Sequence, residues 1–194
     1  MRTILLLTLM FVSSGATAAA RQRWQLEAVP TAVGTVTAPG ASGPGNYLYL
    51  SLKVANHTGR SVSLRLALTV ATEVPGRRYR GGYDPLIHRH LEEHVFGREM
   101  KTLSASRGPL ADGDEIEILV TFGKIDPLVG RFDISIDGLA DRVYQDKHKW
   151  WVEDRILSLS YVRGGDDLER HLDRLVLRSA RWREAAPRRE LPRK

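Results

Sequence analysis

Two runs of alternating apolar residues constrain the fold of this chain more than any other feature of its sequence. In residues 47–55 every second side chain is leucine or valine, and residues 64–70 repeat the pattern after a polar stretch at 56–59. Successive side chains of a strand point to opposite faces, so each run predicts a strand with one buried face. The polar stretch contains a glycine, and this arrangement predicts an antiparallel hairpin.

Further apolar segments bounded by turn residues predict strands at 24–29, 77–80, 116–122, 132–136, 150–163 and 175–182. Residues 30–46 are rich in glycine, proline, serine and threonine, and we expect a loop or loose arm there. No strand alternates with a long amphipathic helix, which argues against a parallel α/β sheet. The sequence therefore predicts a mainly β fold, an antiparallel β-sandwich of about seven to nine strands.

One short helix is expected as an insertion between the strands. Asp84 followed by Pro85 is typical of a helix N-cap and the first helical position, and Gly97 is a suitable end. The apolar residues between them have helical spacing: Leu86, Ile87, Leu91 and Val95. We expect this stripe to face the core.

The first twenty residues have the features of a secretory signal peptide. Arg2 precedes an apolar stretch, and three alanines at 18–20 form a small-residue cleavage pattern. Cleavage is expected after Ala20 or after Ala18, and an uncleaved membrane anchor is the alternative. The chain has no cysteine, which excludes disulfides, thiolate metal sites, a cysteine nucleophile and a lipoprotein anchor. We therefore expect a secreted or periplasmic protein.

The basic charge is concentrated near the C-terminus. The chain has 29 basic and 23 acidic side chains, and residues 178–194 alone hold seven basic and two acidic ones. Nucleic-acid binding is not expected, because it needs a folded basic face with stacking aromatics. The end of the chain has instead the composition of a solvated tail, which could contact an anionic surface through Arg188, Arg189, Arg193 and Lys194.

These observations divide the chain into four parts. The expected segments are a signal peptide (1–20), an N-terminal strand and Gly/Pro-rich loop (21–46), a β-sandwich domain (47–182) and a basic flexible tail (183–194).

Three of the six histidines lie close together at 88–94. On a helix, His90 and His94 share a face and could both bind one zinc ion. Residues 90–94 also fit the H-x-x-E-H pattern of inverted zincins, with Glu93 as the base. The alternatives are weak metal binding and a solvated helix face, and this short β-rich chain lacks the larger α/β body of that enzyme class.

Two surface regions are candidates for binding a partner. Trp150 and Trp151 are adjacent in an expected strand, so one indole should enter the core while the other remains at the surface. An exposed indole could stack on a sugar or anchor a partner protein, and an aromatic ring partly covered by a loop is the alternative. The second region is the insertion at 77–98, which begins with Arg77, Arg78 and Tyr79.

Several segments together resemble exported bacterial immunoglobulin-like domains. They are YLYLSLKVANHTGRSVSLRLALTVAT (47–72), LADGDEIEILVTFGKIDP (110–127) and RFDISIDGL (131–139). Such domains have a strand ending near V-x-N-x-T/S-G and a Gly-Asp or Gly-Glu turn before an apolar strand. The later run LSLSYVRGGDD, followed by Trp182, is similar to a group of uncharacterised planctomycete-type secreted proteins, in which proline usually stands at the position of Gly164. The resemblance covers about residues 47–183 and implies an immunoglobulin-like fold without implying catalytic residues.

The sequence favours a binding function over an enzymatic one. It contains no nucleophile elbow and no phosphate-binding loop. Export and a sandwich architecture predict a non-enzymatic binding or assembly module of the cell envelope, with an envelope protein or a polysaccharide as partner and without a cofactor. The alternative is a metal-binding protein or metal-dependent hydrolase centred on His90 and His94.

Overall fold

The computed structural model describes residues 21–146, 149–164, 175–185 and 189–190. The segment expected to be a signal peptide, residues 1–20, lies outside them. Within the described residues, no helix is both long enough and apolar enough to cross a membrane. The described chain is mainly β with one short helix, as the sequence predicts.

Thirteen strands are formed within the described residues. They are β1 (Arg21–Gln25), β2 (Glu27–Gly40), β3 (Gly43–Ala55), β4 (Val62–Leu64), β5 (Ala67–Thr72), β6 (Arg78–Arg80), β7 (Lys101–Thr102), β8 (Gly108–Leu110), β9 (Glu115–Lys124), β10 (Arg131–Asp146), β11 (Lys149–Arg163), β12 (Leu175–Glu184) and β13 (Arg189–Glu190). Five of them have three residues or fewer, and the other eight are longer. The helix α1 (Pro85–Leu91) continues into a π-helical turn, η1 (Glu92–Phe96).

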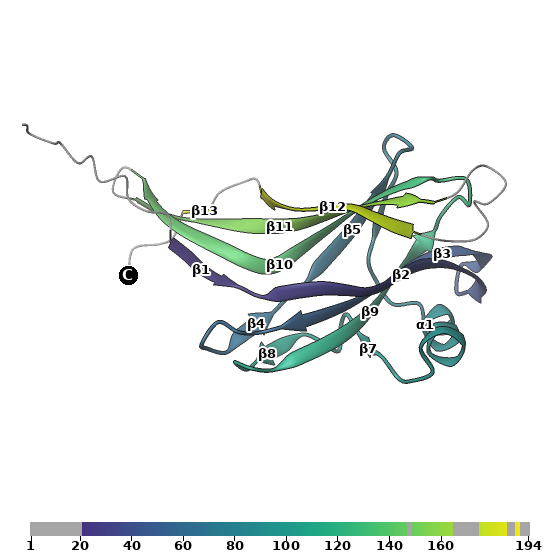
Figure 1. The fold of residues 1–194 in the computed structure, drawn as a ribbon, viewed down its shortest axis with the longest axis horizontal. Helices are drawn as coiled ribbons and strands as arrows, with labels where there is room; N and C mark the ends of the chain where they lie inside the picture. Colours follow the sequence, from purple (N-terminus) through teal and green to yellow (C-terminus); the bar gives the residue numbers. More distant parts are fainter. Residues whose placement is uncertain (1–20, 147–148, 165–174, 186–188, 191–194) are drawn as a thin grey trace, which may run out of the picture.

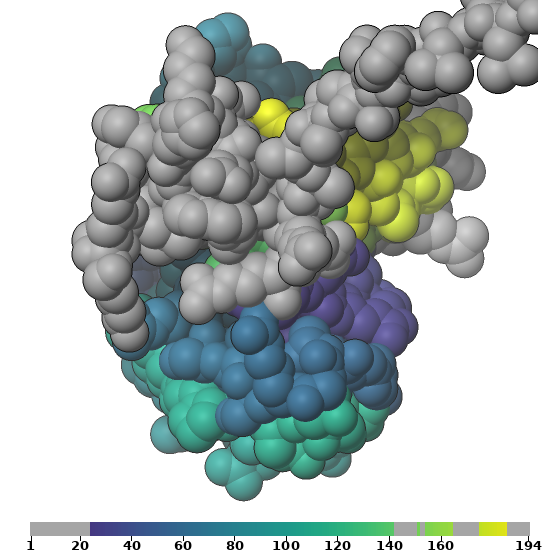
Figure 2. All heavy atoms as spheres, turned by 90° about the vertical axis from the view of Figure 1, so that its left-hand side faces the viewer, coloured from purple at the N-terminus to yellow at the C-terminus, as the bar shows by residue number. Residues whose placement is uncertain are grey.

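The strands form two large sheets that lie face to face (Figure 1). Sheet A has the order β12-β11-β10-β5-β6, with β1 also paired to β10 and β13 to β11, and sheet B has the order β2-β3-β9-β7. All pairs are antiparallel except β7 with β9. A small pair, β4 with β8, lies at the end opposite α1 (Figure 1). Figure 2 looks onto this end, where blue and teal parts of the chain lie side by side at the surface.

The core lies between the two sheets and receives the alternating side chains of both. Leu50 and Leu52 of β3 are fully buried there, and so are Val70 of β5 and Ile134 of β10. Burying an aliphatic side chain of this size stabilises a fold by about 1.5–3 kcal/mol. The period-2 pattern of the sequence therefore predicts the buried faces correctly.

The expected hairpin between residues 47–55 and 64–70 is wrong. The strand β3 pairs with β2 and β9 in sheet B, whereas β5 pairs with β10 and β6 in sheet A. The chain crosses between the sheets near Asn56, which is fully buried and donates from Nδ2 to the carbonyl oxygens of Arg60 and Leu110, 2.8 Å from each. Alternation specifies the buried face of a strand but not its partner.

The expected loop at 30–46 is also wrong, because most of this segment belongs to β2 and to the beginning of β3. The strand β2 is at the edge of sheet B, where proline is tolerated. Its glycines face tyrosines of β3: a Cβ on Gly34 would lie 2.7 Å from the hydroxyl oxygen of Tyr49. Small residues that resemble loop composition thus make room for the aromatic rings of the neighbouring strand.

The helix begins as predicted, with Asp84 as N-cap and Pro85 in the first turn, and Gly97 ends η1 in a left-handed conformation. Ile87 and Leu91 are fully buried, but Leu86 and Val95 are nearly half exposed. The expected stripe is therefore only half correct. The π-helical turn moves the residues after Leu91 out of α-helical register.

The C-terminal strand at 175–182 is confirmed and extends to Glu184. Arg183 and Glu184, the first residues of the expected tail, belong to β12, and Arg189 begins β13 beside β11. The strand β13 can pair there because β12 pairs only with residues 155–163 of β11, which leaves the edge of the first part of β11 open to β13. The residues Arg188, Arg193 and Lys194 lie outside the described residues.

Candidate functional site

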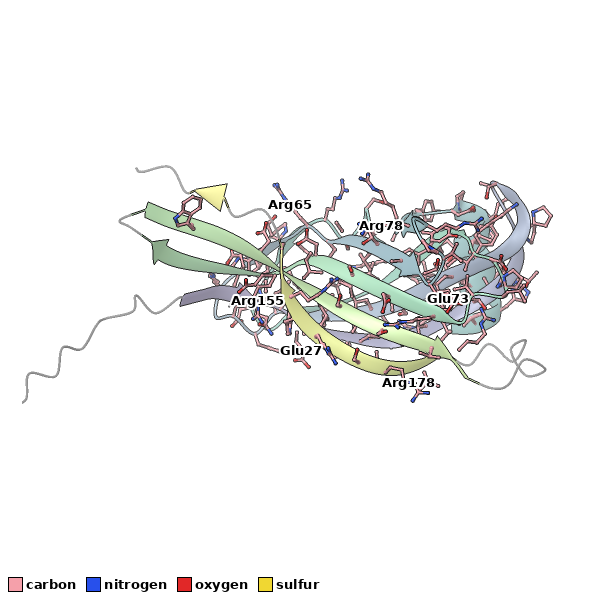
Figure 3. All side chains as sticks on the ribbon, turned by 90° about the horizontal axis from the view of Figure 1, so that it is seen from above. Glu27, Arg65, Glu73, Arg78, Arg155 and Arg178 are labelled. Atoms are coloured by element: carbon pink, nitrogen blue, oxygen red, sulfur yellow. The ribbon has the colours of Figure 1, made fainter. Side chains whose placement is uncertain are left out.

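The outer face of sheet A is hollowed into a groove of about 680 Å³. This volume falls within the range of small-ligand sites, roughly 300–1,000 Å³. The groove runs over β6, β5, β10, β11 and β12, so it crosses the sheet from one edge to the other. Figure 3 looks onto this face, with Arg78 at one edge and Arg178 of β12 at the opposite edge.

Small polar side chains form the floor of the groove. One cross-strand row consists of Ala71, Asp133, Ser160 and Ser179, and the next consists of Thr69, Ser135 and Ser158. These residues face outward because their chain neighbours, such as Leu159 and Ile134, face the core. The floor is therefore shallow and rich in hydroxyl groups.

Each edge strand of sheet A has an aromatic residue between two arginines. In β6 these are Arg78, Tyr79 and Arg80, and in β12 they are Arg181, Trp182 and Arg183. Tyr79 and Trp182 pack against the core, whereas the four flanking arginines are exposed. The aromatic ring thus holds each edge strand on the core and directs two guanidinium groups to the outer face.

Arginine dominates the charge of the groove. Its lining contains four arginines (Arg78, Arg131, Arg181 and Arg183) and two acidic residues (Asp133 and Glu184). Nη2 of Arg183 donates to Oγ of Ser135, 3.0 Å away, so this side chain extends from β12 over β11 to β10. Asp133 accepts a hydrogen bond of 2.6 Å from Ser160, and Nε of Arg131 lies 3.5 Å from its other oxygen. The groove is therefore electropositive.

The lining of the groove suits an anionic ligand. Neither histidine nor cysteine occurs among the described residues that line it. Arginines and hydroxyl groups at fixed positions suit charge-assisted hydrogen bonds to carboxylate, sulfate or phosphate groups.

The structure separates the surface residues that the sequence singles out. Arg78 forms part of the groove, but Tyr79 turns toward the core and Arg77 precedes β6. Trp150 and Trp151 are on the first part of β11, paired with residues of β10 that follow its bulge. Trp151 is half-buried and does not line the groove, and the side chain of Trp150 is outside the part of the chain that the structure describes.

His90 and His94 come together without forming a larger ligand set. Their rings stack with centroids 4.3 Å apart, and Nδ1 of His94 lies 3.0 Å from the carbonyl oxygen of His90. Glu93 is exposed on η1. The described part of the chain contains no group of three His, Cys, Asp or Glu side chains that could hold a metal ion. The zinc hypothesis thus has two nitrogen ligands and no third residue to support it there.

A buried histidine on this helix is not predicted by any pattern in the sequence. His88 is only 4% exposed, and its Nε2 lies 3.0 Å from the carbonyl oxygen of Met100 and 3.2 Å from Oε1 of Glu92. Glu92 also accepts the backbone N–H of Met100 at 2.7 Å. These contacts connect α1 to the segment before β7, so the role of His88 is to hold the helix in place.

A second polar cluster lies on the outer face of sheet B, and its side chains form hydrogen bonds with one another. One oxygen of Glu117 accepts hydrogen bonds from Thr31 and Ser51, at 2.7 and 2.8 Å, and its other oxygen binds Arg98. Burial raises the pKa of Glu117, but the hydrogen bonds from Arg98, Thr31 and Ser51 together outweigh it and lower this pKa to about 2. Its hydrogen-bonding capacity is used within the protein, so this cluster stabilises sheet B.

Comparison with known protein families, curated proteins and solved structures finds no match for this chain. The resemblance to exported immunoglobulin-like domains therefore remains a prediction. The arginine-rimmed groove is the strongest indication of function in the described residues. Its sequence signals are the two Arg-aromatic-Arg segments and the outward serines of β11, none of which identifies a site until the strands are placed side by side.

Proposed function

We propose that this protein is an exported, non-enzymatic binding or assembly module of the cell envelope, and that the groove on sheet A is its contact surface. The observation that carries the proposal is the gathering of four arginines over a hydroxyl-rich floor, from strands far apart in the sequence. Arginines and hydroxyl groups held close together suit charge-assisted hydrogen bonds to an anionic partner. Export rests on the N-terminal sequence pattern alone.

The strand order supports an immunoglobulin-like sandwich for this module. In sheet B, the order β2-β3-β9 follows A-B-E of immunoglobulin domains, and in sheet A the order β11-β10-β5-β6 follows G-F-C-C′. The strand β12 is then an addition beside G, and it supplies one arginine rim of the groove. Such sandwiches host many functions, so the function is inferred from the groove rather than from the fold.

The test is retention by envelope material from the organism that makes the protein. Purified protein is mixed with the sedimentable envelope fraction, and the bound share is measured for wild type, for Arg78→Gln/Arg183→Gln and for a control, Arg89→Gln/Arg107→Gln. The control removes two exposed arginines outside the groove, so its change in net charge is the same.

We expect the groove variant to be retained several-fold less than wild type and the control to behave like wild type. Equal retention of all three proteins would show that the groove is not the contact surface. Circular dichroism of each variant establishes that the fold is intact.

A further inference from the structure

We propose that the ligand of the groove is a linear anionic polysaccharide whose negative groups are sugar carboxylates. This inference rests on the proposed function and names the chemical class of its partner. It is carried by the two arginine rims, by the distance between them and by the hydroxyl-rich floor.

The rims require a ligand with several negative charges. Arginine binds carboxylates through two parallel N–H···O hydrogen bonds, a geometry that lysine cannot provide. On β12, Arg181 and Arg183 are two residues apart, which places their Cα atoms about 7 Å from each other, whereas on β6 only Arg78 lines the groove. A repeating anion can satisfy both members of such a pair, whereas a single carboxylate can satisfy only one.

The distance between the rims requires an extended ligand. The edge strands β6 and β12 are separated by β5, β10 and β11, which is four inter-strand spacings, or about 19 Å. Arg183 shortens the gap because its guanidinium group reaches Ser135 on β10. A chain lying across the strands would contact Arg78, then the floor, and then Arg183.

The floor favours a carbohydrate over an acidic peptide. Its five hydroxyl residues, Thr69, Ser135, Ser158, Ser160 and Ser179, can donate and accept hydrogen bonds, as the hydroxyl groups of a sugar do. Arginine clusters also bind acidic peptides, but grooves that hold an extended peptide usually add apolar pockets for alternate side chains or a free strand edge. The groove floor is the central face of a sheet, and its strands β5, β10 and β11 are already paired on both sides there.

The lining also separates this ligand from other polyanions and from neutral sugars. The described lining residues include no aromatic side chain, so they offer nucleic-acid bases no ring on which to stack. A neutral sugar would likewise find no aromatic ring on which to stack, and it would leave the arginines without an anionic partner. Charge must therefore supply most of the affinity, and sugar carboxylates provide it along with hydroxyl groups.

The experiment measures binding of polygalacturonate, a polymer of a carboxylated sugar, by isothermal titration calorimetry. The probes for comparison are poly-L-glutamate, a peptide with similar carboxylate density, and neutral dextran. The proteins are wild type, Arg78→Gln, Arg183→Gln, the double variant, Arg183→Lys and the Arg89→Gln/Arg107→Gln control.

We expect wild type to bind polygalacturonate more tightly than it binds poly-L-glutamate. Dextran should show no binding. Each single groove variant should lose about tenfold in affinity, as expected for one charge-assisted contact, and the double variant should lose about a hundredfold. Arg183→Lys should recover only part of the loss because it keeps the charge without the guanidinium geometry. The control should remain within about twofold, and affinity should fall as salt is added.

Two outcomes overturn the inference while leaving the proposed function standing. If poly-L-glutamate binds as tightly as polygalacturonate with the same dependence on Arg78 and Arg183, the ligand is an acidic peptide. If no probe binds although envelope retention depends on these arginines, the partner is not a carboxylated polysaccharide. Loss of affinity in the control equal to that in the double variant would instead indicate non-specific attraction, which overturns both proposals.

Discussion

A single carboxylate, that of Glu117, connects three strands and a loop on the outer face of sheet B. Its partners are Thr31 on β2, Ser51 on β3 and Arg98 in the segment before β7. These hydrogen bonds stabilise the ionised form, and the pKa of Glu117 is about 2 in the folded protein against an ordinary value of 4.5. The stabilisation is therefore present above pH 4.5 and is lost as the pH falls from about 4.5 to about 2.

We expect Glu117→Gln to lower the free energy of unfolding at pH 7 by about 1–2 kcal/mol, a value reduced by solvent screening at this partly exposed site. The variant should also lose less stability than wild type as the pH falls from 4.5 to 2.5. Urea unfolding of both proteins at several pH values measures this. Glu115→Gln is the matched control, because its exposed ion pair with Lys53 is worth little. Parallel pH profiles for wild type and Glu117→Gln would contradict the prediction.

At the scale of elements, a bulge divides β10 into two parts with different partners. Before the bulge β10 pairs with β5, and after it with β1. Gly138 lies in the bulge with φ +85°, and a Cβ there would collide with the carbonyl oxygen of Arg65. Both the backbone conformation and the close approach thus require glycine.

We expect Gly138→Ala to destabilise the protein by about 2–4 kcal/mol, since the strained conformation and the collision add to each other. Thermal unfolding measures the effect. Gly82→Ala is the control: no atom lies within 4 Å of a Cβ at Gly82, so little change is expected. A Gly138→Ala protein as stable as the control would show that the bulge can relax.

The helix α1 is attached to sheet B through its cap. Oδ1 of Asp84 accepts the backbone N–H groups of Leu86 and Ile87, at 3.1 and 3.3 Å. Oδ2 accepts the backbone N–H of Ala41, at 2.8 Å, in the turn between β2 and β3. One side chain therefore starts the helix and connects it to the hairpin.

Asp84→Ala should cost about 1–2 kcal/mol, as expected for loss of an N-cap, whereas Asp84→Asn should cost less because its amide oxygen still caps the helix. Chemical denaturation of the two variants measures the difference. Equal stability of Asp84→Ala and wild type would mean that burial of Ile87 and Leu91 alone positions the helix.

At the scale of the whole molecule, one core joins the two large sheets. Residues of β3 and β9 pack with residues of β5, β10 and β11 in a single buried cluster. All four tryptophans, Trp24, Trp150, Trp151 and Trp182, belong to strands of sheet A. Tryptophan fluorescence therefore reports on sheet A even when a substitution is made in sheet B.

Leu50→Ala, in sheet B, should destabilise the protein by about 2–5 kcal/mol because it leaves a cavity in the shared core. We expect the fluorescence transition of sheet A to move to lower denaturant concentration by the same amount as the transition in far-ultraviolet circular dichroism. Separate transitions, with the tryptophan signal unchanged, would show that the sheets unfold independently.

The candidate site could be predicted only in part. Arg78 is named by the sequence analysis, but Arg131, Arg181, Arg183 and the serines of the floor are not. Arg181 and Arg183 resemble the solvated charges of a tail when only their neighbours in sequence are considered. They become part of a groove because β12 pairs with β11 and faces β6 across the sheet.

The fold, like the site, could be predicted from the sequence only in part. Alternation in β3, β5, β9 and β10, the cap at Asp84 and the turn glycine at Gly97 are local signals, and each was sufficient to predict its strand face or helix end. The loop expected at 30–46 failed because composition cannot show that Gly34 faces a tyrosine of the next strand.

The sequence by itself determined which faces of the strands are buried and where the helical segment begins and ends, because these depend on neighbours within a few residues along the chain. Only the tertiary structure decided which strands are partners, that the chain crosses between sheets at Asn56, and that arginines from positions 78 and 183 share one groove. The reason is physical: an alternating strand gains the same burial against any apolar sheet, so its partner is selected by the packing of the entire core.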